Sequence, residues 1–448
     1  AGSAAPDTPV IIAGAGPVGT LLALLLARDG RRVRLLERRS DPRVGAAERG
    51  RSINLALAAR GLAALEQAGV LERVRAELVA MRGRQLHDRD GRGALLPYGQ
   101  RPDELIYAVS RARLNTALIE AAAAVPLIAM EFGRRVTDVD PADGRVRWNG
   151  PAGATQLDGP ARLVIGADGA GSALRQALQE RGALQAREEP LAHGYRELHI
   201  PALPDGGWAF DPHALHVWPR GEYMLIALPN PDHTFTATLF LPAAGPDSFD
   251  ALRTAAAART FFAREFPDAL ARIADFDAQF AAHPQGQLGT LHCWPWHVRR
   301  VLLIGDAAHA IVPFHGQGLN CGFEDCVQLA ALLADEPDPH SACARFEQQR
   351  RPNTDAIAAM AIENYQDMRA AVLAPDFPLR KQLALDLERR FPGRFIPRYS
   401  MVMFHAEIPY AEARRRGALQ DDMLDALLAA GAGADSPLAA RLMAGYAP

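Results

Sequence analysis

Three short apolar runs along the chain each end at a glycine-containing turn, and an apolar-periodic segment follows each turn. The runs begin at Val10, near Arg162 and at Val301. A short apolar run closed by glycine is typical of a buried strand, and apolar positions three and four residues apart are typical of a helix. The pattern predicts repeated strand–turn–helix units and therefore an α/β fold.

The first unit carries a candidate nucleotide-binding motif. Gly14, Gly16 and Gly19 have the spacing Gly-x-Gly-x-x-Gly, a helix is expected over residues 20–29, and a second strand over 33–36 stops at Glu37. The glycines permit a tight turn and close approach of the backbone to a diphosphate, and the acid can accept a ribose hydroxyl. The motif predicts dinucleotide binding. Arg38 is either a solvated residue or one that lies along the adenosine.

The second and third units end in acidic turns. Residues 162–175 place Asp168 after the strand and Ser172 as the N-cap of the next helix, while Asp306 closes the strand that starts at Val301. A Pro/Gly-rich turn follows, and a helix begins near Leu319. A helix N-terminus behind a glycine turn suits an anion. Two such strand–turn–helix units in one chain suggest one large cofactor that is bound at both of its ends.

Bulk properties exclude several classes of protein. The 448 residues carry a net charge of −3, whereas a nucleic-acid-binding face would be basic. The four cysteines form no Cys-x-x-Cys pair, which fits a reducing cytosol, and no cluster has metal-ligand spacing. We expect no signal peptide and no membrane span, because the longest purely apolar run is Leu21–Ala27. The expected location is cytoplasmic.

The rest of the chain predicts a sheet and further helices. Residues 194–241 contain short β-rich runs with a hairpin near 229–232, and residues 250–280 are helical with Phe261, Phe262 and Phe266 at core spacing. Residues 352–387 are helical again, and two short helical stretches are expected in 411–448. Residues 140–160 are expected to be a Gly/Pro-rich loop.

The order of these motifs resembles the single-component flavin aromatic hydroxylases. The resemblance narrows to the kynurenine 3-monooxygenases, of the bacterial type without a C-terminal membrane anchor, and covers most of the chain from residue 10 to about 410. It is carried by GRSINLAL (50–57), MRGR (81–84), PYG (97–99), HGYREL (193–198), residues 216–241, IENYQDM (362–368) and RFIPRYSMV (394–402).

The resemblance implies a fold and a division into domains. A Rossmann-type FAD-binding domain, discontinuous in sequence, is expected to comprise residues 1–73, 104–180 and 286–368. A mixed β-sheet substrate domain is expected to comprise 74–103 and 181–285, and a helical C-terminal layer to comprise 369–448.

The resemblance also implies cofactor contacts. Asp306 is expected to meet the ribityl chain of FAD. The N-terminus of the helix from Gly318 is expected to face the pyrimidine edge of the flavin, where reduced flavin carries negative charge. The full expected set of FAD-binding residues is Gly14, Gly16, Val18, Gly19, Glu37, Arg38, Leu55, Arg111, Asp306, Gly318, Leu319 and Asn320.

Kynurenine is an aniline with an amino-acid tail, so its site needs a carboxylate clamp and an apolar slot. The resemblance implies a clamp of Arg84, Tyr98 and Tyr399, with Asn364 nearby. The expected lining of the ring slot is Ile106, Leu215, Met224, Leu228, Phe240 and Met368, with Pro313, Phe314 and His315 on the flavin side. His315 has either a shape and hydrogen-bonding role or a proton-handling role, because the neutral aniline already donates its lone pair to the ring.

The implied reaction is hydroxylation of L-kynurenine to 3-hydroxykynurenine with NADPH and O2, through a flavin C4a-hydroperoxide. The chain contains one complete Gly-x-Gly-x-x-Gly motif, so NADPH is expected to dock transiently. Three alternatives stay open: a sister hydroxylase of another aromatic acid, an uncoupled NADPH oxidase with an aromatic effector, and a non-catalytic dinucleotide-binding module. A monomer or a homodimer is expected.

Overall fold

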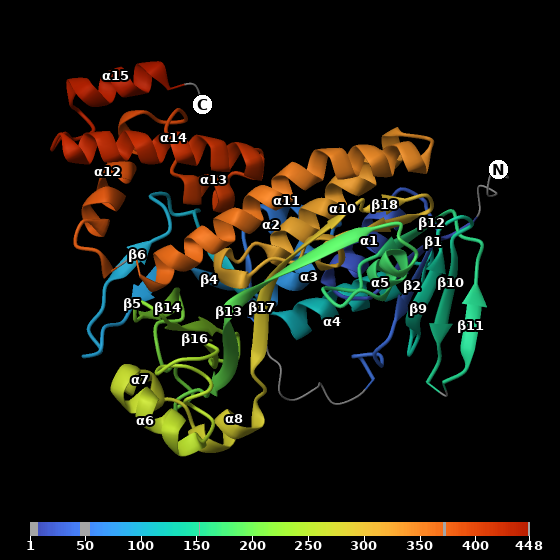
Figure 1. The fold of residues 1–448 in the computed structure, drawn as a ribbon, viewed down its shortest axis with the longest axis horizontal. Helices are drawn as coiled ribbons and strands as arrows, with labels where there is room; N and C mark the ends of the chain where they lie inside the picture. Colours follow the sequence, from blue (N-terminus) through green and yellow to red (C-terminus); the bar gives the residue numbers. More distant parts are fainter. Residues whose placement is uncertain (1–7, 45–53, 152, 371–372, 447–448) are drawn as a thin grey trace. The chain divides into compact units, whose positions relative to one another are not determined.

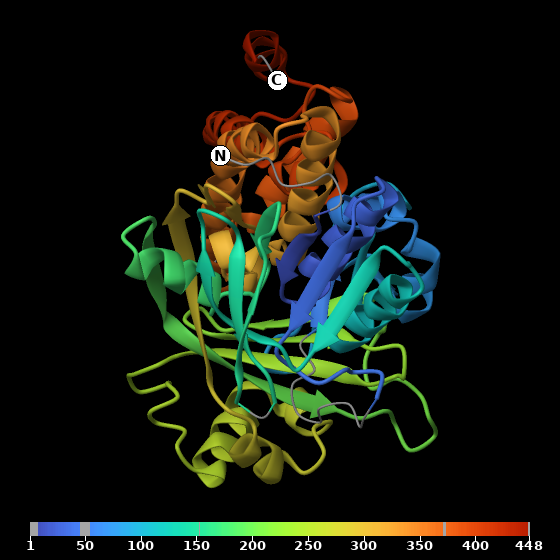
Figure 2. The ribbon, with the colours of Figure 1, turned by 90° about the vertical axis from the view of Figure 1, so that its right-hand side faces the viewer.

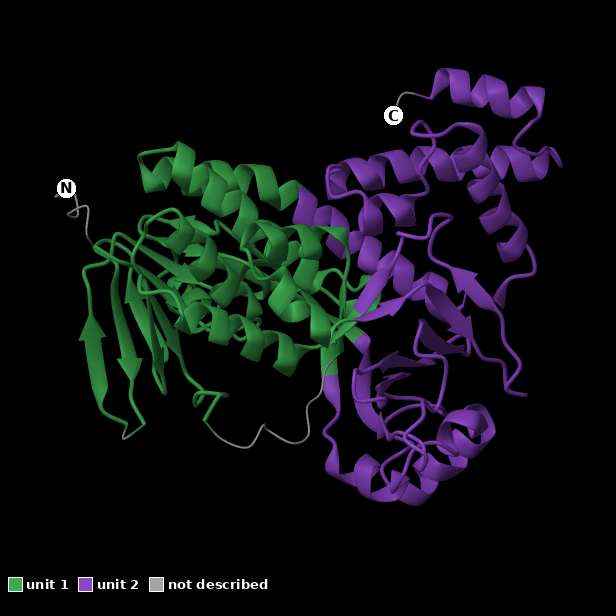
Figure 3. Cartoon of the chain, turned by 180° about the vertical axis from the view of Figure 1, so that it is seen from behind, with its two compact units in different colours: residues 1–78, 108–191, 287–352 green, residues 79–107, 192–286, 353–448 purple. Residues whose placement is uncertain are grey.

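The computed structural model describes residues 8–44, 54–151, 153–370 and 373–446. The chain divides into two compact units (Figure 3). Unit 1 contains residues 1–78, 108–191 and 287–352, and unit 2 contains residues 79–107, 192–286 and 353–448. The chain therefore enters each unit three times.

Unit 1 is built on a six-stranded sheet with the order β18-β19-β12-β1-β2-β8. All neighbouring strands are parallel except the edge pair β18 and β19. The blue strands β1 and β2 lie side by side in Figure 2. The elements of unit 1 are β1 (Val10–Ala13), α1 (Pro17–Arg28), β2 (Val33–Glu37), β3 (Asn54–Leu57), α2 (Ala59–Gln67), α3 (Leu71–Val74), η1 (Arg75–Glu77), α4 (Arg111–Ala123), β8 (Ile128–Phe132), β9 (Arg135–Asp140), β10 (Arg145–Asn149), β11 (Thr155–Asp158), β12 (Leu163–Gly166), α5 (Ala173–Glu180), β18 (His297–Val298), β19 (Val301–Leu303), α9 (Asp306–His309), η2 (Pro313–His315) and α10 (Gly318–Asp335).

This sheet confirms the predicted Rossmann-type α/β fold. Strand β1 lies between β2 and β12, so the strand order reverses beside β1, and α1 packs against α4 and α10. Ligands of such sheets bind outside the carboxyl ends of the strands at the reversal point. Gly14 follows β1, Asp168 follows β12 and Asp306 follows β19, so all three predicted turns lie at this end of the sheet.

One expectation about unit 1 is wrong. Residues 140–160 are not a loop, because β9, β10 and β11 form a three-stranded antiparallel sheet. Strand β10 reads Arg-Val-Arg-Trp-Asn, and the alternation buries Val146 and Trp148 while the arginines lie exposed. The period of two was present in the sequence, but the strands are only four to six residues long and glycine turns separate them.

Unit 2 contains a mixed sheet in which the strand order is β13-β16-β15-β14-β5-β6. The pair β14 and β5 is parallel and the other neighbours are antiparallel, including the predicted hairpin of β15 and β16, in which Pro229 faces Phe235. The elements of unit 2 are β4 (Val79–Met81), β5 (Gly83–Leu86), β6 (Leu95–Pro97), β14 (Ala214–Pro219), β15 (Met224–Pro229), β16 (Phe235–Pro242), α6 (Ala255–Glu265), α7 (Pro267–Leu270), α8 (Phe276–Ala282), α12 (Phe377–Arg390), α13 (Arg398–Phe404), α14 (Tyr410–Ala429) and α15 (Pro437–Gly445). Four elements contribute residues to both units: β7 (Ile106–Ser110), β13 (Gln185–Ile200), β17 (Gly286–Trp294) and α11 (Pro339–Arg369). Figure 1 labels β13, β17 and α11.

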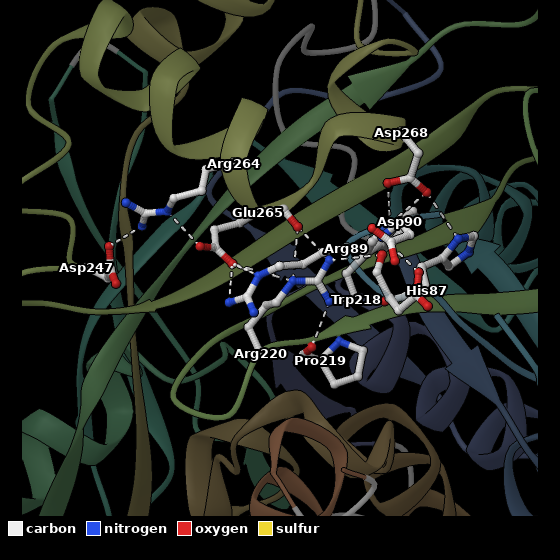
Figure 4. A network of polar contacts seen from close by, with 11 residues as sticks. His87, Arg89, Asp90, Trp218, Pro219, Arg220, Asp247, Arg264, Glu265 and Asp268 are labelled. Carbon is white, nitrogen blue, oxygen red and sulfur yellow. Dashed lines mark hydrogen bonds and ion pairs between the residues drawn. The ribbon is translucent and has the colours of Figure 1, made fainter. Parts of the chain in front are cut away.

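One face of the unit 2 sheet packs against α6, α7 and α8. Its core includes the three predicted phenylalanines, Phe261, Phe262 and Phe266. Polar contacts fix the same face: the Trp218 indole N–H donates to both carboxylate oxygens of Asp268 at 2.9 and 3.0 Å. Figure 4 shows this pair beside a second one, in which Arg220 and Glu265 are both almost fully buried. These contacts all lie on one face of the sheet, so the side chains of the opposite face can contribute to a ligand site.

Candidate functional site

The first glycine turn of unit 1 is shaped by two close backbone approaches. Gly14 has φ +100°, and a Cβ there would lie 2.5 Å from the Ala167 carbonyl oxygen. A Cβ on Gly19 would lie 2.0 Å from the Gly14 carbonyl oxygen, which no side chain tolerates. A Cβ on Gly16 would meet no described atom within 4 Å. The turn therefore brings strand and helix together at Gly14 and Gly19, and leaves open space in front of Gly16, the N-cap of α1.

Glu37 is an ionised acceptor at the end of β2. Its side chain is buried and accepts from Ala15 N at 2.8 Å and from the N and Nε of Arg39, both at 2.9 Å. Burial alone would raise the pKa of Glu37, but the hydrogen bonds and charge of Arg39 bring the pKa below its usual value. Both Arg38 and Arg39 are exposed, and the hydrogen bonds of Arg39 make it the arginine that orients the acid.

The turn that carries Asp306 is tied to helix α10. Asp306 is exposed at the start of α9, directly after Gly305. The Gly305 N–H donates to Asp325 Oδ2 at 2.9 Å, and His309 Nε2 lies 2.6 Å from the same oxygen. A fully buried carboxylate thus fixes both ends of the four-residue helix, while the Asp306 carboxylate stays available at its tip. His309 therefore helps to orient this turn through its contact with Asp325.

A chain of buried charges holds Asp325 in place. Arg350 donates from Nε to Asp325 Oδ1 at 2.8 Å and from Nη1 to Glu324 Oε2 at 2.6 Å, and Arg60 donates to Glu324 Oε1 at 2.9 Å. Burial would raise the pKa of Asp325, but the charges of His309 and Arg350 lower it below its usual value. The acid therefore stays ionised, and the network fixes the geometry of the turn.

One group within the described ranges has side chains close enough for a metal ion. The ligand atoms of His309, Cys321 and Asp325 lie within 4.8 Å of one another. The guanidinium of Arg350 already donates to Asp325 and lies 3.3 Å from the Cys321 sulfur, and burial raises the pKa of that thiol. The Arg350 guanidinium, a permanent cation, lies where a metal ion would have to bind. We therefore assign His309, Cys321 and Asp325 to the charge network.

Asn320 joins two segments of unit 1 through its side chain. Its Oδ1 accepts from the backbone N–H of Ala58 at 2.9 Å and of Gly61 at 3.2 Å. Its Nδ2 donates to the carbonyls of Ala56 and Gly316, both at 2.8 Å. Every donor and acceptor of the amide is used, so Asn320 can offer a ligand only its backbone N–H in the first turn of α10.

The remaining predicted cofactor residues are placed as follows. Val18 is half-buried, and its side chain lies 3.3 Å from an ideal Cβ of Gly305 and 2.7 Å from one of Gly322, so it packs between two glycines. Gly318 and Leu319 begin α10, and the side chain of its N-cap residue, Gln317, makes no capping hydrogen bond. Leu55 is half-buried in β3, and Arg111 is the exposed first residue of α4.

The predicted clamp residues meet in unit 2. Arg84 on β5 lies over the Tyr399 ring at 4.9 Å, and the Tyr399 and Tyr98 rings are stacked with centroids 5.8 Å apart. Arg84 Nη2 lies 3.4 Å from Asn364 Oδ1, and the Asn364 amide nitrogen lies 3.4 Å from the sulfur of Met368. The Arg84 Nε is buried and has no hydrogen-bond partner among the described residues.

The electrostatics of the clamp favour a charged arginine between neutral phenols. Burial alone would lower the pKa of Arg84, but the phenol oxygens of Tyr399 and Tyr98 raise it. Burial raises the pKa of both tyrosines, with the Arg84 charge opposing it. A guanidinium flanked by two phenol hydroxyl groups is suited to a carboxylate.

Four of the predicted ring-slot residues, on β14, β15 and β16, share one face of the unit 2 sheet: Leu215, Met224, Leu228 and Phe240. Leu215 pairs with Arg84, Met224 pairs with Phe240, and Leu228 pairs with Thr236, so their side chains point to the same side. This is the face opposite the core formed with α6 to α8. Five of the six lining residues are buried: Ile106, Met224, Leu228, Phe240 and Met368.

The turn between α9 and α10 contains the three residues expected on the flavin side. Pro313, Phe314 and His315 form the short helix η2, which ends at Gly316 with φ +64°. Phe314 and His315 are buried and Pro313 is exposed. An ideal Cβ on Gly316 would lie 3.0 Å from the Ala56 Cβ, so the turn packs closely on β3.

Comparison with known proteins decides the family. The chain matches the family described as FAD binding domain over residues 7–360. It is 50% identical over 426 residues to the kynurenine 3-monooxygenase of Stenotrophomonas maltophilia (strain K279a), covering 95% of this chain and 92% of that one. The chain belongs to the kynurenine 3-monooxygenase family.

Further relatives agree with this membership. The kynurenine 3-monooxygenase of Myxococcus xanthus (strain DK1622) is 46% identical over 426 residues, again covering 95% of this chain and 92% of that one. Among solved structures, the tetrameric form of 2-methyl-3-hydroxypyridine-5-carboxylic acid oxygenase superposes with a TM-score of 0.66 at 20% identity, over 93% of this chain and 98% of that one. The p-nitrophenol 4-monooxygenase of Pseudomonas putida DLL-E4 has a TM-score of 0.67 at 18% identity, over the same shares. These two show the fold alone.

Membership of the kynurenine 3-monooxygenase family confirms that the chain is an FAD-dependent monooxygenase. The turn at Gly14 and Gly19, the acceptor Glu37 and the uncapped α10 N-terminus fit that cofactor. In the described parts of the chain, no helix combines the length and the apolar character that a membrane crossing requires.

Sequence reasoning missed the charge network below the Asp306 turn. Nothing in the motif pattern assigned a role to Asp325, Arg350, Glu324 or Arg60. A signal was present, because Glu324 and Asp325 are adjacent acids inside an otherwise apolar helical stretch, CGFEDCVQLAALL. Buried acids require cationic partners. The pattern could predict that such partners exist, but it could not say where in the chain they are.

Proposed function

We propose that the protein hydroxylates L-kynurenine at the ring 3-position, with NADPH and O2, to give 3-hydroxykynurenine. The observation that carries the proposal is the clamp of Arg84, Tyr98 and Tyr399. Its guanidinium has a buried Nε without a hydrogen-bond partner in the described chain, and two phenol groups lie beside it. A carboxylate of an amino-acid tail would supply the missing acceptor.

The apolar face of the unit 2 sheet supports an aromatic substrate. Leu215 lies next to Arg84 in register, and Met224 and Phe240 continue the same face. We assign the aminophenyl ring to this face, with Ile106, Leu228 and Met368 as further lining. Apolar walls keep water away from the reacting ring and so limit wasteful release of hydrogen peroxide.

Unit 1 offers the groups that would hold FAD. Backbone N–H groups at Gly16 suit the diphosphate, Glu37 suits a ribose hydroxyl, and the exposed Asp306 suits the ribityl chain. When bound, FAD takes electrons from NADPH and activates O2. The backbone N–H groups in the first turn of α10 would stabilise negative charge on the flavin ring.

The ring of the substrate carries its own activating group. A neutral aniline amine donates its lone pair to the ring, so no residue has to remove a proton before hydroxylation. We therefore propose that Pro313, Phe314 and His315 mainly shape the site, with His315 as the one residue of this turn that could also handle a proton. A shaping role and a proton-handling role of His315 would give the hydroxylation rate different pH dependences.

The units suggest bounds for the domains. We assign FAD binding to unit 1 and substrate recognition to unit 2, which also contains the C-terminal helices α12 to α15. Transient NADPH docking, a monomeric or homodimeric state and the cytoplasmic location stay predictions.

The first experiment is NADPH oxidation by the purified flavoprotein with and without L-kynurenine, with product mass and hydrogen peroxide measured together. A stimulated rate, a product one oxygen heavier and little peroxide support the proposal. Stimulation with peroxide alone would make kynurenine an effector of an uncoupled oxidase. Absence of stimulation would favour a sister hydroxylase, and a panel of aromatic acids would then identify its substrate.

A further inference from the structure

Lys381 is the only lysine in the chain and lies on helix α12 beside the clamp. Its Nζ donates to the Pro97 carbonyl at 2.9 Å, and Pro97 precedes Tyr98. Gln100 donates from Nε2 to the Leu385 carbonyl at 3.0 Å and to Glu388 Oε2 at 2.6 Å. Positions 381, 385 and 388 are spaced i, i+4 and i+7, so one stripe of α12 holds the segment that carries Tyr98.

The opposite side of α12 is anchored independently of the clamp. Leu383 and Leu387 are buried in a core with residues of α14 and α15. Arg380 donates to Asp421 on α14 at 2.9 Å. The position of the helix backbone therefore does not depend on Lys381, and replacing that side chain should leave α12 in place.

Lys381 and Arg84 are close enough to repel each other. Burial and, to a smaller extent, the charge of Arg84 together lower the pKa of Lys381 to about 8. Asp367 is the acid that interacts with Arg84, and burial raises the pKa of Asp367, which weakens it as a permanent counter-charge. Two half-buried cations with an incomplete counter-charge favour binding of an anion.

The titratable and charged groups that face this region come from five elements or loops. Arg84 lies on β5, and Tyr98, Arg101 and Glu104 lie on the loop between β6 and β7. Asp367 lies on α11, Tyr399 on α13 and Glu388 on α12 itself. Glu104 and Glu388 are both bonded to the Gln100–Arg101 segment. Their charges are therefore already engaged.

We propose that Lys381 is a positioning residue that supplies a second positive charge for the substrate carboxylate held by Arg84 and fixes the segment of Tyr98 through Pro97. This inference rests on the proposed function. Arg84 would make the direct contact, and Lys381 would act through the field at the clamp and through the Pro97 carbonyl. The expected ligand class is an aromatic amino acid or keto acid with a free carboxylate.

A charge that titrates near neutrality links substrate binding to pH. The carboxylate binds better when Lys381 is protonated, so affinity is full below the pKa of the free enzyme, about 8, and falls as the pH rises above it. We expect the Kd of L-kynurenine to be roughly tenfold higher at about pH 9.5 than at about pH 7. The bound carboxylate raises the pKa of the ammonium group, which sets the upper end of this fall.

The test is direct binding of L-kynurenine to the flavin-loaded protein without NADPH, read from the flavin absorbance at about pH 7 and about pH 9.5. The variants are Lys381→Met, Lys381→Arg and, as a matched loss of charge on the same helix, the exposed Arg389→Met. We expect Lys381→Met to bind roughly tenfold more weakly at pH 7 and to lose the pH dependence. Lys381→Arg should bind tightly at both pH values, and Arg389→Met should match the parent protein.

The possible results distinguish a failure of the proposed role of Lys381 from a failure of the proposed function. If the parent protein binds L-kynurenine and Lys381→Met binds it equally well with the alkaline fall intact, the role of Lys381 is refuted and the proposed function stands. If Lys381→Arg keeps the alkaline fall, the titrating group is another one and the inference fails again. If the parent protein binds no kynurenine, the proposed function itself fails.

Because the chain has one lysine, amine chemistry gives an independent measurement. An amine-acylating reagent should modify Lys381 more slowly when L-kynurenine saturates the protein, and peptide mass mapping locates the modification. We expect a reduction of several-fold in rate, since the carboxylate raises the pKa of the amine and lowers its reactive fraction. A rate that is unchanged by saturating kynurenine would contradict the proposal.

Discussion

Replacing Arg350 by methionine should destabilise unit 1 and release FAD. Arg350 is 1% exposed and donates to Asp325, Glu324 and the Cys321 carbonyl. Glu324 keeps Arg60 as a partner, but Asp325, which is fully buried, would keep only His309 and the Gly305 N–H. Breaking a buried pair by removing one partner typically costs about 3–5 kcal/mol, because the remaining charge is uncompensated.

The assay is urea unfolding followed by flavin fluorescence, which rises when FAD leaves the protein. A loss of about 3–5 kcal/mol changes the equilibrium between the folded and unfolded states by roughly two to three and a half orders of magnitude. Arg351→Met is the matched control, because Arg351 is the exposed neighbour on the same helix and lies over the Trp294 ring at 5.9 Å. The control should change the midpoint little.

The pH dependence gives a second check. The pKa of Asp325 is lowered in the folded protein, so its stabilising contribution is present above the unfolded pKa and is lost as the pH falls through the folded pKa. Without Arg350 the folded pKa should rise, so the deficit of the variant should be largest near neutral pH and should shrink in acid. A deficit below about 1 kcal/mol at neutral pH, or one that grows in acid, would refute the buried-charge argument.

Three further predictions follow from the geometry of the site. Arg84→Met should raise the KM for L-kynurenine about 100-fold while FAD is retained, because a charged contact of about 3 kcal/mol is lost. The control Arg82→Met, at a more exposed arginine, should leave the KM unchanged. Loss of the yellow colour in Arg84→Met would instead indicate that Arg84 has a folding role. Asp306→Ala should weaken FAD binding about tenfold in flavin titrations, and unchanged affinity would refute the ribityl assignment. Gly19→Ala should yield protein without bound flavin, measured as the absorbance ratio at purification, since its Cβ would lie 2.0 Å from a backbone oxygen; a normal ratio would mean that the turn can relax.

The FAD-binding half of the fold could be predicted because its signals are local. An apolar run, a glycine turn and a periodic helix lie within 20 residues, and the structure confirms all three units with Ser172 as an N-cap that accepts from Arg175 N. The small sheet β9-β10-β11 was missed because its strands are too short for the period of two to stand out. Local pattern therefore located elements well where they are long or closed by glycine.

The candidate site was predictable only in part. Arg84 and Asn364 are 280 residues apart in sequence, and no periodicity relates them, so their meeting was expected only through family resemblance. The pattern also could not show that Arg39 rather than Arg38 contacts Glu37, or that the Asn320 amide is used within the fold. Such choices depend on which side chain reaches which partner after tertiary packing, which sequence spacing does not encode.

The clamp and the glycine turns belong to different compact units of the same chain. Arg84 and Tyr98 lie on one chain segment of unit 2, and Asn364 and Tyr399 on another, whereas Gly14, Glu37 and Asp306 lie in unit 1. Substitutions that alter substrate choice therefore fall on segments that do not form the flavin-binding turns. An evolving lineage, or a protein engineer, can change the accepted aromatic acid in one unit while the oxygen-activating half of the enzyme is inherited intact.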